Sequence, residues 1–264
     1  MTSHGPAPTP TGDKPVWSGD RLIDPHAASD KAPRVRAMFS AIAGSYDLNN
    51  RVHSLWRDQS WRAAVVRQVA PSPEDRVLDV ACGTGDLAWM FAPLVEPPVL
   101  GLDFTMPMLP LAREKGRSPS KGGSASVMWI NGDAQALPLP NRSVDIATMA
   151  FGLRNLSDPA LGVREMARVL KPGGRAAVLE FTEPKNSLAR WASNFYTRQV
   201  MPRTATLLSG DRSGAYRYLP RSVATFLDAA GVRALMTQSG LTRVRSTPLT
   251  LGIAPLTVGE VPAE

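Results

Sequence analysis

Three aspartates stand at or just after predicted strands, where their side chains suit a nucleoside ligand. A carboxylate accepts hydrogen bonds from ammonium, hydroxyl and amino groups. Asp79 is placed for an ammonium group, Asp103 for two ribose hydroxyls, and Asp133 for an adenine amino group beside the backbone amide of Ala134. The structural alternatives are an Asp79 that caps nearby loop amides and an Asp133 that closes an Asx-turn.

The stretch VLDVACGTGDLA (77–88) predicts a strand, a tight turn and a helix. Gly83 and Gly85 let the backbone turn sharply and approach a ligand, to which the next helix offers its N-terminus. Gly83, Thr84 and Gly85 also begin a match to the dinucleotide fingerprint G-x-G-x-x-G/A, and a turn without any ligand is a further reading. The loop alone therefore indicates a nucleotide-like ligand without identifying it.

The acidic residues around this loop favour S-adenosyl-L-methionine over a nicotinamide dinucleotide. Asp79 and Asp86 would both oppose a diphosphate at the helix N-terminus, whereas Asp79 suits the ammonium group of S-adenosyl-L-methionine. Asp103 serves the ribose in either case and does not discriminate. We therefore expect S-adenosyl-L-methionine as the cofactor.

The scarcity of cysteine and histidine argues against several classes of enzyme. Cys82 is the only cysteine, and His4, His26 and His53 are the only histidines. We expect no intramolecular disulfide, no metal site and no Ser-His-Asp triad. No stretch reaches the ~18–20 apolar residues of a membrane span, and the N-terminus lacks a secretory apolar region. These features predict a cytoplasmic protein.

The basic charge of the chain is concentrated towards its C-terminus. The formal net charge is +7, and residues 184–264 hold ten Arg or Lys against four Asp or Glu. Such a surface suits nucleic acid or an anionic membrane, although a solvated basic face explains it equally well. We expect no nucleic-acid partner, because FGLRN (151–155) stands where a nucleic-acid methyltransferase would carry an N/D-P-P-Y-type run.

The remaining pattern predicts one α/β domain behind a leader. Residues 1–33 are Pro-rich and read as a disordered or loosely attached leader, and 34–264 as the domain, with a helical cap inserted at about 185–220. The expected strands are 76–81, 98–103, 126–131, 144–151, 175–181, 242–248 and 250–257. Beyond the N-terminal helices, the expected helices are 86–91, 106–115, 159–170 and 223–239, the last interrupted at Gly231. This alternation predicts a mostly parallel seven-stranded sheet in a Rossmann-like fold.

Several separated motifs together resemble the menaquinone/ubiquinone biosynthesis C-methyltransferases. They are MFSAIAGSYDLNN (38–50), VLDVACGTGDLA, GLDFTMPML (101–109), GDAQALPLPNRSVDIAT (132–148), FGLRNLSDPALGVREMARVLKPGGRAAVLEFTEP (151–184) and SGDRSGAYRYLPRSV (209–223). The resemblance covers about residues 35–259. It implies a class I S-adenosylmethionine-dependent methyltransferase fold, with Phe104 and Ala150 added to the cofactor contacts. The long leader, Ala150 in place of Ser, and Gly210 where Asn would fit depart from the pattern.

The resemblance also implies methyl transfer to a ring carbon of a demethylated quinol, most directly demethylmenaquinol. Carried over from the family, Arg154 would stabilise phenolate charge or position a water, Asn155 would bind a quinol oxygen, and Tyr46 would close over the site. The structural alternatives are a salt bridge of Arg154 with Asp158 or Asp47 and a core role for Tyr46. Neither a histidine nor a cysteine stands out as a base, and Cys82 reads as a small buried loop residue.

The expected partners follow from this reaction. The acceptor is a prenylated quinol, and the basic cap would contact anionic lipid at the inner face of the cytoplasmic membrane. The cap residues expected at that surface are Trp191, Phe195, Tyr196, Leu207 and Leu208. A homodimer is left open. The alternatives are methylation of a ubiquinone precursor or another phenolic or sterol-like acceptor, a nicotinamide-dependent oxidoreductase, and a non-catalytic member of a biosynthetic complex.

Overall fold

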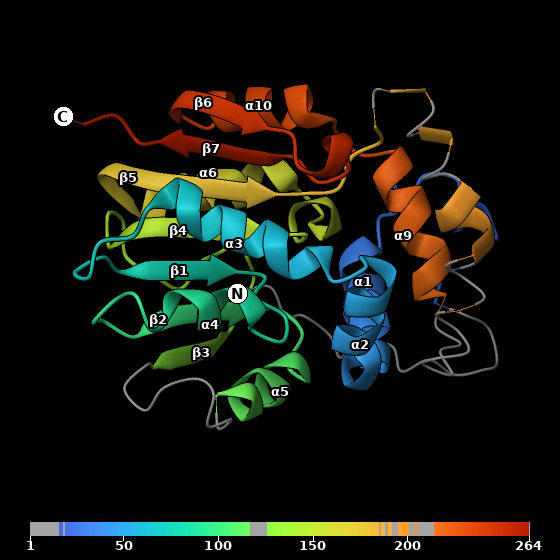
Figure 1. Ribbon diagram of the computed structural model, residues 1–264, viewed down its shortest axis with the longest axis horizontal. Coiled ribbons are helices and arrows are strands. Elements are labelled where there is room, and N and C mark those ends of the chain that lie inside the picture. Colours follow the sequence, from blue (N-terminus) through green and yellow to red (C-terminus); the bar gives the residue numbers. More distant parts are fainter. Residues whose placement is uncertain are drawn as a thin grey trace.

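A seven-stranded, mostly parallel β-sheet forms the centre of the protein in a computed structural model (Figure 1). The structure describes residues 16–17, 19–116, 126–184, 186–187, 190–191, 195–200, 204 and 214–263. The strands are β1 (Val77–Val80), β2 (Val99–Asp103), β3 (Val127–Asn131), β4 (Val144–Ala150), β5 (Leu170–Leu179), β6 (Thr242–Thr247) and β7 (Leu256–Glu260). Their order is β3-β2-β1-β4-β5-β7-β6. The predicted fold class is confirmed.

The first five strands run parallel, and β7 enters the sheet antiparallel between β5 and β6. All four residues of β1 are buried, because helices cover both faces of the sheet. α3 (Arg57–Val69) and α4 (Asp86–Phe91) bury one face, and α6 (Pro159–Val169) and α10 (Ala229–Gln238) bury the other. α5 (Met108–Lys115) lies beside β3. The carboxyl ends of the parallel strands are thereby left free for a ligand.

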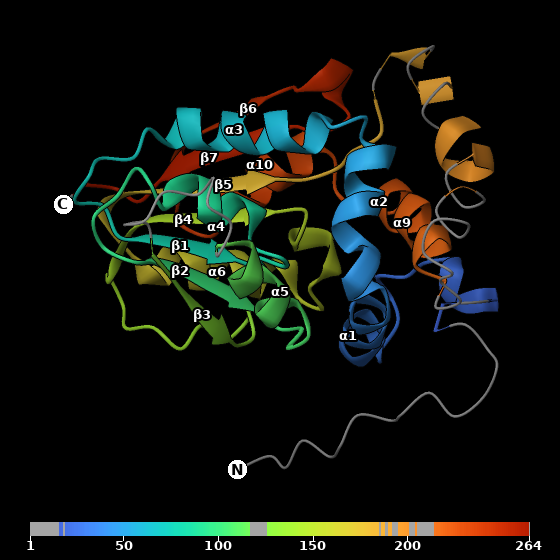
Figure 2. The same cartoon turned by 60° about the horizontal axis from the view of Figure 1, so that its bottom comes forward.

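A group of helices stands beyond these carboxyl ends. It comprises α1 (Lys31–Ile42), α2 (Tyr46–His53) and α9 (Ala215–Ala224), as Figures 1 and 2 show. The short helices are η1 (Gly19–Leu22), η2 (Ala43–Ser45), η4 (Leu153–Asn155), the π-helix η5 (Tyr196–Val200) and η6 (Thr250–Gly252). Trp17 is fully buried in this group and lies against Tyr218 of α9, with ring centroids 4.5 Å apart. The packed part of the chain therefore begins before residue 34, inside the expected leader, of which residues 1–15 and 18 lie outside the described residues.

Three boundaries predicted from the sequence are wrong. The break in segment 223–239 falls between α9 and α10, because Asp228 caps α10 by accepting the N–H of Gly231, which lies inside the helix. Segment 250–257 begins as η6, where Leu251 has φ +56°, and β7 starts only at Leu256. β5 begins at Leu170 in the expected turn, because Leu170 pairs with Val144 of β4.

Candidate active site

In the loop after β1, the backbone angle φ is positive at Ala81, Gly83 and Gly85. The two glycines serve different purposes. A Cβ on Gly85, which has φ +77°, would lie 2.3 Å from the Trp129 ring and 3.1 Å from Ala112 Cβ. A Cβ on Gly83, which has φ +55°, would meet nothing closer than Tyr46 Cε1, at 3.9 Å. Gly85 therefore lets the loop pack on β3, whereas Gly83 leaves open space in front of the loop.

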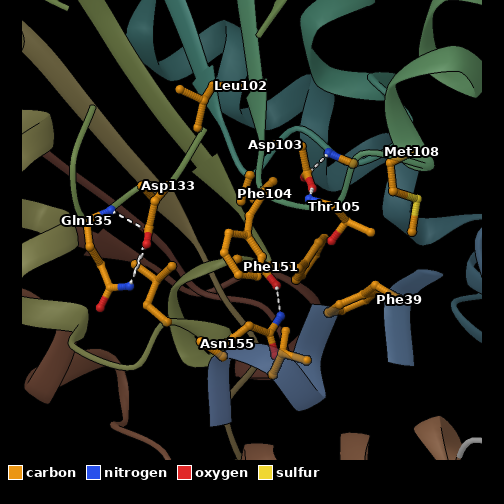
Figure 3. A pocket seen from close by; sticks show the side chains of 18 of the residues that line it. Phe39, Leu102, Asp103, Phe104, Thr105, Met108, Asp133, Gln135, Phe151 and Asn155 are labelled. Atoms are coloured by element: carbon orange, nitrogen blue, oxygen red, sulfur yellow. Dashed lines mark hydrogen bonds between the residues drawn. The ribbon is translucent and has the colours of Figure 1, made fainter. Parts of the chain in front are cut away.

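That open space belongs to a cavity at the carboxyl ends of β1, β2 and β4 (Figure 3). It brings together eight of the residues predicted from the sequence: Tyr46, Gly83, Asp103, Phe104, Asp133, Ala134, Ala150 and Asn155. Asp103 accepts the N–H groups of Gly83 and Thr105, each at 2.7 Å, one on each carboxylate oxygen. These bonds fix the carboxylate at the cavity wall with lone pairs to spare for hydroxyl donors.

Asp133 closes an Asx-turn and also faces the cavity. Its Oδ1 accepts the N–H of Gln135 at 2.9 Å, which makes an Asx-turn, and the residue also lines the cavity. Figure 3 shows Asp103 and Asp133 on opposite sides of the Phe104 ring. The Arg36 guanidinium covers this ring, 3.6 Å from its centroid. The cavity thus offers two separated carboxylates and an aromatic surface, which together fit a purine nucleoside.

Asp79, Thr84 and Gly85, which the sequence also predicts at the cofactor, are not among the residues that line this cavity. Asp79 is 1% exposed, and its Oδ1 accepts the hydroxyl of Thr148 on β4 at 3.0 Å. Its Oδ2 has no partner, and burial raises the pKa of Asp79 to about 7, against the effect of the Thr148 hydroxyl. Asp79 therefore sits beneath the loop as a buried carboxylate with one free acceptor.

A charged network fastens α2 to the loop and to α5. The Lys115 ammonium lies 2.6 Å from oxygens of both Asp47 and Asp86, and it donates to Thr84 Oγ1 at 2.9 Å. The Thr84 hydroxyl in turn donates to Asp47 at 2.6 Å. Burial alone would raise the pKa of Asp86, but Lys115 and neighbouring arginines bring it well below its usual range. The network holds the start of α2, and with it Tyr46, over the cavity.

A second, larger and mainly apolar cavity of about 480 Å³ lies between the N-terminal helices, α9 and the end of β5. Its apolar lining includes Met38, Ile42, Trp61, Phe181 and Leu219. Phe39, Tyr46 and Phe151 line this cavity and also the first one. The two spaces therefore meet at three aromatic side chains, so that a ligand in one can approach a ligand in the other.

Arg154 and Asn155 stand at this junction from η4. Arg154 is 5% exposed and lines the larger cavity, where its Nη1 donates to Glu180 Oε1 and to the Phe151 carbonyl, both at 2.7 Å. Glu180 is thus the salt-bridge partner of Arg154, and the alternative salt bridge with Asp158 or Asp47 is wrong. Arg154 Nε is buried without a partner, which leaves one donor of the guanidinium unused.

Tyrosines and a histidine complete the larger cavity. Burial raises the pKa of Tyr46, so its hydroxyl stays protonated near neutral pH. The Tyr218 hydroxyl donates to Asn155 Oδ1 at 3.0 Å, and burial raises the pKa of Tyr218 to about 12. His53, the histidine that sequence reasoning set aside, lines the cavity and shares a 2.9 Å hydrogen bond with Tyr196. Within the described ranges, no group of three or more His, Cys, Asp or Glu could hold a metal ion.

Sequence comparison assigns this arrangement to a family. A family-wide profile described as the ubiE/COQ5 methyltransferase family matches residues 27–260. The chain belongs to the ubiE/COQ5 methyltransferase family. Among similar curated proteins, the demethylmenaquinone methyltransferase of Deinococcus radiodurans is 45% identical over 88% of this chain and 94% of its own length. The ubiquinone/menaquinone biosynthesis C-methyltransferase UbiE of Geobacter sulfurreducens is 40% identical over 91% of this chain and 93% of its own.

Solved structures agree with the fold. A methyltransferase of Thermotoga maritima, described as S-adenosylmethionine-dependent, superposes with a TM-score of 0.59 over 85% of this chain and 98% of its own, at 20% identity. As a member of this family, the protein is an S-adenosylmethionine-dependent C-methyltransferase, and the cofactor predicted from the sequence is confirmed. The first cavity fits that cofactor, because a Cβ at Gly83 would fill its open space and Asp103 retains free acceptor capacity.

Sequence reasoning missed Glu180, Tyr218, Thr148 and Lys115. Each acts through a partner 26 to 69 positions away, which no local pattern specifies. The only signal for Glu180 was its place at the end of a predicted strand, the same signal that identified Asp103. No helix in the described part of the chain has the length and apolar character needed to cross a membrane.

Proposed function

We propose that the protein transfers a methyl group to a ring carbon of a prenylated quinol, with demethylmenaquinol as the first candidate. The observation that carries this proposal is the large apolar cavity that meets the first cavity at Phe39, Tyr46 and Phe151. An aromatic acceptor ring with an apolar tail needs such a space. The relatives' names support it, because they include both demethylmenaquinone and ubiquinone/menaquinone methyltransferases.

The cofactor side of the site would be held by residues from four strand ends. Asp103 would bind the ribose hydroxyls, Asp133 and the Ala134 amide the adenine edge, and Phe104 the adenine face. Gly83 and Ala150 would leave room for the remainder. When bound, S-adenosyl-L-methionine supplies a methyl group activated by a positive sulfonium. The chain's own contribution is to align that group with the acceptor and to keep water away.

The acceptor side would be organised by Arg154, Asn155 and Tyr46. A ring carbon becomes nucleophilic as the neighbouring phenol oxygen loses its proton, so the developing negative charge must be stabilised. Arg154 provides a buried positive charge, and its side chain lines the larger cavity. Tyr46, with its raised pKa, provides a protonated hydroxyl where the two cavities meet.

A mass-spectrometric assay with purified protein tests the proposal. Reduced demethylmenaquinone and a reduced ubiquinone precursor would be offered side by side with S-adenosyl-L-methionine, and an unrelated phenol would serve as the control. We expect one methyl group on a ring carbon of demethylmenaquinol. Methylation of the ubiquinone precursor instead would reassign the acceptor. Cofactor binding without any quinol product would refute the quinone assignment.

We also propose that the acceptor enters from the inner face of the cytoplasmic membrane. Leu55 and Trp56 are 77% and 60% exposed, and Leu55 lines the larger cavity. Trp191 and Phe195, 67% and 56% exposed, stack with centroids 6.0 Å apart, next to Tyr196 of the same cavity. Exposed apolar groups at a cavity mouth, on a basic chain, suit an anionic lipid surface. Leu207 and Leu208, expected at this surface, lie outside the described residues.

Vesicle co-sedimentation tests the membrane contact. We expect binding to phosphatidylglycerol-containing vesicles that falls with salt and is weakened in Leu55→Ser. Leu94→Ser is the matched control, because Leu94 is also an exposed leucine, 44% exposed, but lines neither cavity. Equal binding by both variants, or none by the wild type, would refute the contact.

A further inference from the structure

Phe151 has an unusual backbone at the point where the two cavities meet. It follows β4 with φ +60°, a conformation that bulky residues rarely adopt and that only surrounding structure can maintain. Its ring lines both cavities and is 8% exposed. The position of this ring therefore decides how the two spaces face one another.

Two side chains hold the Phe151 carbonyl in place. Arg154 Nη1 donates to it at 2.7 Å and Asn155 Nδ2 at 3.1 Å; Figure 3 shows the second bond. The Phe151 N–H donates to Leu179 O at 2.7 Å, and its ring stacks on Phe181 with centroids 4.3 Å apart. The strained residue is thus fixed through its carbonyl, its amide and its ring.

Glu180 connects these attachments. Its Oε1 accepts from Arg154 Nη1 at 2.7 Å and from the Phe181 N–H at 2.8 Å, and its Oε2 accepts from the Arg154 N–H at 3.0 Å. The carboxylate is 1% exposed and lines neither cavity. The same Arg154 nitrogen therefore binds Glu180 on one side and the Phe151 carbonyl on the other.

We propose that Glu180 is a positioning residue for methyl transfer: it holds Arg154 against the Phe151 carbonyl and so fixes the aromatic wall that cofactor and acceptor share. The inference rests on the proposed function, because it concerns the encounter of those two ligands. Glu180 acts only through Arg154 and Phe181 and touches neither ligand. It also neutralises the guanidinium, which could not otherwise stay buried next to an apolar cavity.

A double-mutant cycle tests this role with the quinol methylation assay. Glu180→Gln and Arg154→Met should each lower kcat by about a hundredfold, as expected for misplaced reacting groups. The double variant should be no worse than Arg154→Met alone, because the Arg154 guanidinium is the group that joins Glu180 to the Phe151 carbonyl. KM for the cofactor should change far less than kcat. The kcat is calculated per folded molecule, because an unfolded fraction also lowers the apparent kcat without changing KM.

Further variants distinguish a loss of positioning from misfolding. Glu180→Gln leaves a buried arginine unpaired, whereas the double variant removes that charge and should remain folded. Asn155→Ala removes the other donor to the Phe151 carbonyl without burying a charge, and kcat should again fall. Asp75→Asn breaks an Arg175 ion pair that is 11% exposed on the aspartate side and remote from both cavities, and should keep full activity.

The possible outcomes separate the two proposals. Losses that multiply in the double variant, or a wild-type kcat in folded Glu180→Gln, would overturn the positioning role while leaving the proposed function intact. A wild-type enzyme that methylates neither quinol would refute the proposed function itself.

Discussion

Replacing Gly85 with alanine should destabilise the fold through contact with Trp129, and a second glycine offers a matched comparison. Gly85 and Gly173 both have φ +77°, so alanine meets the same backbone strain at either position. A Cβ at Gly85 would lie 2.3 Å from the Trp129 ring, whereas a Cβ at Gly173 meets no atom within 4 Å. The difference between the two variants therefore isolates the steric contact.

The magnitudes follow from these two effects. A left-handed backbone costs alanine about 1–2 kcal/mol, which should be the whole loss in Gly173→Ala. Overpacking adds about 1–3 kcal/mol, because the Trp129 ring is held against Trp89 with centroids 5.9 Å apart and cannot swing away freely. Gly85→Ala should therefore lose about 2–5 kcal/mol, and each kcal/mol lowers the Tm of a chain of this size by about 2–4 °C.

Thermal unfolding without cofactor and calorimetric cofactor binding would together test the reasoning. Gly85→Ala should melt below Gly173→Ala, and the further change Trp129→Leu should recover part of the difference. Gly83→Ala should instead weaken cofactor binding with only the strain-related loss of stability, because its Cβ enters open space. Equal melting of Gly85→Ala and Gly173→Ala would show that the Trp129 contact is not what requires glycine in the loop.

Three further predictions concern charged groups of the site. Asp103→Asn should weaken cofactor binding by about 2 kcal/mol, roughly thirtyfold, measured by calorimetry, because the ribose loses a charged acceptor. Burial raises the pKa of Asp79 to about 7, so ionisation of this carboxyl opposes folding. The Tm of the wild type without cofactor should therefore decline between about pH 4 and pH 7 relative to the Tm of Asp79→Asn. A difference in Tm between the two proteins that stays constant with pH would contradict this. Lys115→Met should raise the KM for the cofactor about fivefold, because α2 loses its ion pair to Lys115; the effect is modest because the ammonium is partly exposed. An unchanged KM would refute the coupling between Lys115 and the cofactor site.

The parts of the fold that the sequence predicts are those specified locally. The helix Asp86–Phe91 has its observed bounds because the turn at Gly85 lies just before it. Asp103 and Asp133 lie at one cavity because Asp103 ends one strand of the parallel sheet and Asp133 follows the neighbouring strand, an arrangement that the strand pattern predicts. One local signal misled where a cap competed with a glycine, as Asp228 does with Gly231.

The missed features depend on tertiary contacts. The hydroxyl of Thr148, 69 positions after Asp79 in the sequence, donates to the Asp79 carboxylate beneath the loop. The strain at Phe151 and its restraint by Arg154 and Glu180 require β4 and β5 to be side by side, since the pair spans 26 positions. The spacing of residues within one segment does not predict such pairs.

The place of β7 in the sheet has a consequence for how the protein is made. Its residues, Leu256–Glu260, pair with β5 on one side and β6 on the other, so a late segment occupies an interior position. While the chain is still on the ribosome, Arg175–Leu179 of β5 must wait with an open edge until some eighty further residues have been synthesised. The nascent protein is therefore most prone to aggregation in that interval. A chaperone that has bound the nascent protein should release it once β7 has emerged.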